Sequence, residues 1–126
     1  MVKKMPEDGP GSHAWNVAYD EELADRIRDV VRGEPGLTEK RMFGGLAFLV
    51  HGNMAVSASG QGGMLLRVDP ERTESLVDGR HVRRFEMRGR KMDGWLHVDT
   101  EAVDSEEALR SWVDHGLGYA RSLPPK

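Results

Sequence analysis

Four strand-like segments follow one another between residues 38 and 68, with only a few residues separating each from the next. They span residues 38–42, 46–50, 54–59 and 64–68. Connections this short join antiparallel neighbours, whereas parallel strands need a crossover of about a dozen residues or more. The second segment is apolar throughout, as is typical of a central strand, and alternation in the third predicts that Met54 and Val56 share one face. The spacing therefore predicts an antiparallel meander.

Helical periodicity is found outside this meander. A first helix is expected over residues 19–32, because apolar side chains recur on one face and Gly33 then follows. A shorter helix is expected over 70–77, where Pro70 suits the first helical position. Alternating segments at 82–88 and 95–98 predict two further strands.

The last helix has the clearest start signal. Asp104 is the expected N-cap and Glu107 lies three residues later, which resembles a capping box. The predicted order is α-β-β-β-β-α-β-β-α. Runs of adjacent strands with helices outside them indicate an α+β fold of two layers, in which helices pack on one face of an antiparallel sheet.

The composition of the chain limits the functions that such a fold can have. The chain has 126 residues and a net charge of −3, so we expect one domain and no globally basic surface for nucleic acid. It contains no cysteine, which excludes thiolate catalysis and cysteine-bound zinc. No apolar run approaches the ~20 residues of a membrane span. We expect a disordered N-terminal arm or tag at 1–17 and a cytoplasmic domain at 18–126, without cofactor or membrane partner.

Residues 40–48, KRMFGGLAF, resemble the signature of the TfoX/Sxy N-terminal domain family. Further matches to that family occur in the same order along the chain. They are residues 19–23 before the signature, and 52–54, 94–95 and 119–121 after it. The resemblance covers about residues 18–126.

The resemblance implies a small two-layer α+β domain. Its best-known members regulate natural competence in bacteria, acting with a cyclic-AMP receptor protein at competence promoters, and they are not enzymes. Longer members carry a C-terminal helical domain, which this sequence does not contain, so the resemblance is to a stand-alone N-terminal domain. It implies no catalytic residue. We therefore expect a non-catalytic regulatory module that contacts a protein partner, as a monomer or a weak homodimer.

The glycine pair in the signature has two interpretations. Gly44 and Gly45 allow a turn or bulge between two strands while apolar neighbours pack inward. Their bare backbone N–H groups would alternatively form an anion-binding nest. The phosphate-loop spacing GxxxxGK[ST] is absent. The candidate binding residues here are Arg41, Phe43, Gly44 and Gly45.

A second candidate site is the basic segment 80–91, which holds six Arg or Lys residues against one Glu. Such a patch suits a phosphate backbone or an acidic protein surface. The alternative is a sheet edge whose charges prevent aggregation. Its candidate contacts are Arg83, Arg84, Arg88 and Lys91. Trp95 is either a core residue of the last strand or part of a partner groove.

No spacing in the sequence indicates a metal site or an active site. The five histidines show no pattern such as HExxH, although His97 and Asp99 share a strand face by period two. No serine lies in a GxSxG elbow. Two hypotheses about function remain. The first is a regulatory protein-interaction module, and the alternative is a small-ligand or nucleic-acid binder that uses the segment 80–91.

Overall fold

The computed structural model describes residues 19–42 and 44–126. In chain order its elements are α1 (Glu21–Val31), β1 (Leu37–Met42), β2 (Gly45–Val50), β3 (Asn53–Ala58), β4 (Met64–Arg67), a 3₁₀ turn η2 (Pro70–Arg72), α2 (Thr73–Leu76), β5 (Val82–Met87), β6 (Arg90–Val98), a 3₁₀ turn η3 (Thr100–Val103) and α3 (Glu106–Ser122). The predicted order of helices and strands and the predicted α+β class are confirmed. The predicted arm at 1–17 lies outside the described residues. None of the described helices has the length and apolar character to span a bilayer.

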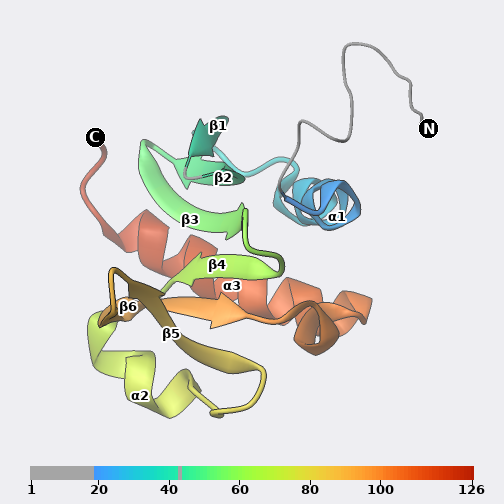
Figure 1. Cartoon of the computed structure of the whole chain (residues 1–126). Helices are drawn as coiled ribbons and strands as arrows, with labels where there is room; N and C mark the ends of the chain where they lie inside the picture. Colours follow the sequence, from blue (N-terminus) through green and yellow to red (C-terminus); the bar gives the residue numbers. More distant parts are fainter. Residues whose placement is uncertain (1–18, 43) are drawn as a thin grey trace, which may run out of the picture.

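The six strands form one antiparallel sheet in the order β1-β2-β3-β4-β6-β5 (Figure 1). The first four strands follow chain order, as their short connections require. The connection through α2 then carries the chain past β4, and β5 forms the outer edge. β6 returns between β4 and β5. The strands β1 and β5 therefore form the two edges of the sheet.

The main hydrophobic core lies between the sheet and the helices α1 and α3 (Figure 1). The apolar stripe of α3 is buried there, with Leu109, Val113 and Leu117 at most 3% exposed. Phe48 and Leu66 contribute from the sheet, and both are fully buried. Each such side chain contributes about 1.5–3 kcal/mol on burial. This layer therefore supplies most of the hydrophobic stabilisation.

A β-bulge in β3 changes the face assignment expected from strict alternation. Phe48 pairs with Val56, but Leu49 pairs with Met54, so Ala55 is an extra residue in β3. The bulge places Val56 in the core under the helices and leaves Met54 in a separate cluster. The prediction that Met54 and Val56 share a face is therefore wrong.

The start of α3 also differs from the prediction. Ser105 is the N-cap, and its hydroxyl oxygen accepts a hydrogen bond of 3.1 Å from the backbone N–H of Ala108. Asp104 instead ends the preceding 3₁₀ turn. Both residues are good caps by type, and the turn η3 decides between them, because it already uses Asp104.

Candidate functional site

The sheet carries a hollow of about 610 Å³ that strands, their connecting turns and Lys126 line, with no described helix among them. Met54 and Leu65 line it, and with Ala47 they form a second buried apolar cluster, separate from the main core. Because α1 and α3 pack against the other cluster, the hollow lies on the sheet face that those helices leave open. A sheet that is apolar on both faces, and whose described helices α1 and α3 cover only one of them, has a surface available for a ligand or partner.

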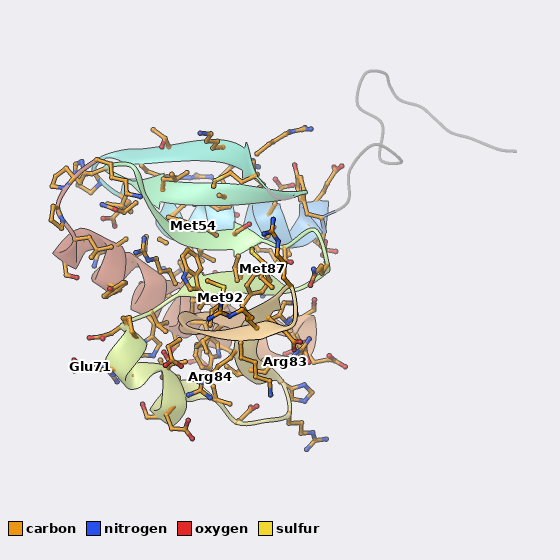
Figure 2. The ribbon with its side chains drawn as sticks, turned by 60° about the vertical axis from the view of Figure 1, so that its left-hand side comes forward. Met54, Glu71, Arg83, Arg84, Met87 and Met92 are labelled. Carbon is orange, nitrogen blue, oxygen red and sulfur yellow. The ribbon has the colours of Figure 1, made fainter. Side chains whose placement is uncertain are left out.

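Methionines dominate this hollow. Four of the five methionines among the described residues line it, one from each of the strands β1, β3, β5 and β6; they are Met42, Met54, Met87 and Met92. Figure 2 shows Met54, Met87 and Met92 near one another between β3 and the β5–β6 hairpin. Met87 is 38% exposed, and no other large apolar side chain among the described residues is classed as exposed. We call this hollow the methionine groove; its other apolar lining residues are Leu49, Leu65, Phe85 and Trp95.

An irregularity between β5 and β6 positions the wall of the groove. Arg84 pairs with Leu96, but the next residue, Phe85, pairs with Met92. Residues 93–95 of β6 therefore have no partner in β5, and Gly94 among them has a φ of +88°, which glycine adopts without strain. As a result Phe85, Met92 and Trp95 all line the groove, although simple alternation would not group them.

Cationic side chains surround the apolar lining. The side chains of Arg67, Arg88 and Lys126 lie at the groove together with one acidic side chain, that of Glu86. The guanidinium carbon of Arg67 lies 5.2 Å from the ring centroid of Trp95 and 5.6 Å from that of Tyr119. Both distances fall within the range of cation–π attraction. Two aromatic rings therefore hold one cation at the rim.

The structure does not gather the arginines of segment 80–91 into one basic surface. Arg83 donates to the carboxylate of Asp99 over 3.0 Å. Arg84 donates to Asp93 and to Glu74, both over 2.7 Å, and its hydrogen bonds to these carboxylates raise its pKa further. Figure 2 shows Arg83 and Arg84 below Met92. Two of the four basic residues of this segment that the sequence predicted as binding contacts, Arg83 and Arg84, are therefore paired with carboxylates of the chain itself.

The geometry of the β1–β2 turn accounts for its glycines. Gly44 lies in the turn with a φ of +77°, which favours glycine. A Cβ on Gly45 would meet the carbonyl oxygen of Ala58 on β3, so the absence of a side chain lets the strands approach. Arg41 is an exposed residue of the edge strand β1. Phe43 lies outside the described residues.

Only part of the residue set predicted from the sequence lies at the groove. Gly45, Arg88 and Trp95 line it. Five other predicted residues are not part of its lining, namely Arg41, Gly44, Arg83, Arg84 and Lys91. Sequence reasoning missed Arg67 and the four methionines. Methionines on separate strands form no sequence motif, so only the pairing of the strands reveals them.

Comparison with known proteins gives one match. The family model of the TfoX N-terminal domain matches residues 29–120. This range includes all six strands, and with them the described lining of the groove except Lys126. Neither the curated proteins nor the solved structures include a match to the chain.

Proposed function

The chain belongs to the TfoX N-terminal domain family, and from this premise we propose that it is a non-catalytic regulatory module, in transcriptional regulation of the competence type, whose methionine groove binds an apolar segment of a protein partner. The observation that carries the proposal is the open sheet face with its methionine lining. Family membership supports the regulatory role, and the groove supports contact with a protein.

Methionine side chains suit a surface that must adapt to its partner. They are unbranched and polarisable, and proteins use clusters of them at binding surfaces that accept varied sequences. Phe85 and Trp95 add rigid aromatic area beside them, and Arg67 adds a fixed cation. Aromatic residues and arginine are enriched among the residues that contribute most to binding energy.

The charge of the rim favours one kind of segment. Three basic side chains, those of Arg67, Arg88 and Lys126, lie at the groove with the single acidic side chain of Glu86. An apolar segment flanked by Asp or Glu would bury its apolar side chains on the methionines and place its carboxylates at the rim. The proposed partner is therefore a protein with an acidic, amphipathic segment.

A displayed peptide library tests this proposal without a known partner. We expect selection on the immobilised chain to enrich apolar peptides with acidic flanks. Isothermal titration should then show at least tenfold weaker binding of a selected peptide to Met87→Glu, because this exposed side chain can change without disturbing the core. Ser111→Glu, which adds the same charge at an exposed position of α3 outside the groove, should bind within twofold of the parent chain. Equal binding of the parent and Met87→Glu would refute the proposal.

The alternative, a nucleic-acid or small-ligand binder at segment 80–91, has separate support. The side chains of Arg80, Arg88, Arg90 and Lys91 form no ion pair with another described residue, and the adjoining groove volume lies within the range of about 300–1,000 Å³ typical of small-molecule sites. Binding of duplex DNA that weakens steeply with salt, and that Arg88→Ala and Lys91→Ala reduce, would favour nucleic acid. DNA binding that is absent, or insensitive to salt, removes that function.

A further inference from the structure

A cluster of histidine and carboxylate side chains lies where β5 begins and β6 ends. The register pairs Val82 with Val98, so His81 and Asp99 are neighbours across the two strands, and the backbone N–H of Asp99 donates to the carbonyl of His81 over 2.8 Å. His97 lies two residues before Asp99 on the same side. The predicted pair of His97 and Asp99 is therefore close, and the fold adds His81 to it.

The tautomer of His97 can be assigned from its surroundings. Its Nε2 lies 2.7 Å from the carbonyl oxygen of Gly62, and because a carbonyl only accepts, Nε2 carries the hydrogen. In the neutral ring, Nδ1 then presents a lone pair. This Nδ1 is buried, has no hydrogen-bond partner and lies 3.4 Å from Oδ1 of Asp99. A lone pair facing a carboxylate oxygen is unfavourable unless a proton or a metal cation lies between them.

His81 approaches the other oxygen of the same carboxylate. Its Nδ1 is also buried without a hydrogen-bond partner and lies 3.5 Å from Oδ2 of Asp99. Glu101 is near, since one ligand atom each from His81, Asp99 and Glu101 lie within 4.8 Å of one another. His81, Asp99 and Glu101 therefore offer one imidazole nitrogen and two carboxylates to one position, and His97 brings a second imidazole nitrogen to the other oxygen of Asp99.

We propose that His81, Asp99 and Glu101 bind a divalent transition metal ion such as Zn²⁺, with His97 as a fourth ligand. Imidazole and carboxylate groups suit zinc. Ligands at about 2.0–2.1 Å from a tetrahedral zinc ion lie about 3.3–3.4 Å from one another, close to the 3.5 Å between Nδ1 of His81 and Oδ2 of Asp99. The bond from His97 to a backbone carbonyl is the arrangement that orients metal-binding histidines.

The charges around the cluster favour a cation. Asp99 and Glu101 bring two negative charges, and Arg83, which donates to Oδ1 of Asp99 over 3.0 Å, returns one positive charge. With neutral histidines the cluster keeps a net charge of −1. Arg83 therefore competes for one oxygen of Asp99 and leaves Oδ2 for the metal. The bound ion would tie the start of β5 to the end of β6.

Zinc titration of the chain, after treatment with a chelator, tests the proposal. We expect one binding site by isothermal titration, and at least tenfold weaker binding in His81→Gln and in His97→Gln. His51→Asn is the matched control, because it removes an imidazole outside the cluster. Asparagine tolerates the positive φ of 51° at that position. Zinc affinity should be unchanged in this control.

Measurement on the parent chain keeps the proposal falsifiable if buried His97 tolerates no substitution. Nitrogen NMR of the histidine rings should show zinc-dependent shifts of Nδ1 in His81 and His97. Binding no tighter than millimolar would overturn the proposal. So would shifts confined to other histidines, or equal affinity in His81→Gln and the parent chain.

Discussion

The contact between α3 and the sheet can be measured with two glycines of that helix. Gly116 faces β3 and β4, where an added Cβ would meet the carbonyl oxygen of Ala55 and lie 2.8 Å from Cδ1 of Leu66. Gly118, two residues further along, is exposed and has no atom within 4 Å of its would-be Cβ. Substitution at these two glycines therefore measures the effect of helix propensity on stability separately from the effect of close packing.

Opposite effects are expected from the same substitution at these two positions. Alanine is favoured over glycine in a helix by about 1 kcal/mol, so Gly118→Ala should stabilise the chain by about 0.5–1 kcal/mol. Gly116→Ala has the same propensity gain, but overpacking against backbone costs about 1–3 kcal/mol. Its net effect should be a loss of up to about 2 kcal/mol. The difference between the two variants, about 1–3 kcal/mol, is the cost of the lost close approach.

Urea unfolding monitored by tryptophan fluorescence measures both variants. The slope of the transition should match that of the parent chain, so that the shift in midpoint reports stability alone. In thermal melts, about 1 kcal/mol corresponds to about 4 °C for a domain of this size. If Gly116→Ala stabilises the chain as much as Gly118→Ala does, α3 does not approach the sheet as closely as described, and the reasoning fails.

Three further substitutions test local interactions. Ser105→Ala should destabilise the chain by about 1 kcal/mol in urea because it removes the N-cap of α3, whereas Asp104→Ala should cost less than about 0.5 kcal/mol. A larger loss in Asp104→Ala than in Ser105→Ala would show that Asp104, the residue predicted from the sequence, is the N-cap. Thr73→Val should cost about 1–3 kcal/mol because it leaves a buried backbone N–H without its acceptor, and Thr73→Ser, which keeps the hydroxyl, should unfold at a urea concentration nearer that of the parent. Arg121→Gln removes two hydrogen bonds to Glu34, of 2.9 and 2.7 Å, the first cause of the lowered pKa of Glu34. A lowered carboxyl pKa stabilises the fold above the unfolded value of 4.5, and that stability is lost as pH falls through the folded value. The loss of stability in this variant should therefore be up to about 1 kcal/mol at pH 7 and should shrink below pH 4.5. A loss that is constant with pH would contradict the pairing.

Local patterns predicted the fold because they act over short distances along the chain. The short connections from β1 to β4 allow only antiparallel neighbours, and the apolar stripes of α1 and α3 repeat with the helical period. The same reasoning failed at Val56, because one bulge residue exchanges the faces of a strand. It also missed the N-cap at Ser105, where two adjacent residues were equally suitable by type.

The candidate sites depended instead on residues that are distant in sequence. No motif links Met42, Met54, Met87 and Met92, and strand order together with two irregularities of register places them on one face. The basic segment 80–91 was visible in the sequence, but its carboxylate partners were not, since they come from other segments.

The sequence by itself determined the number, type and order of the elements, because propensity, periodicity and connection length are properties of neighbouring residues. Only the tertiary structure decided which side chains meet across the sheet. A shift of register by one residue moves a side chain to the opposite face, so the methionine groove and the pairing of His81 with Asp99 exist only once the register of the strands is fixed.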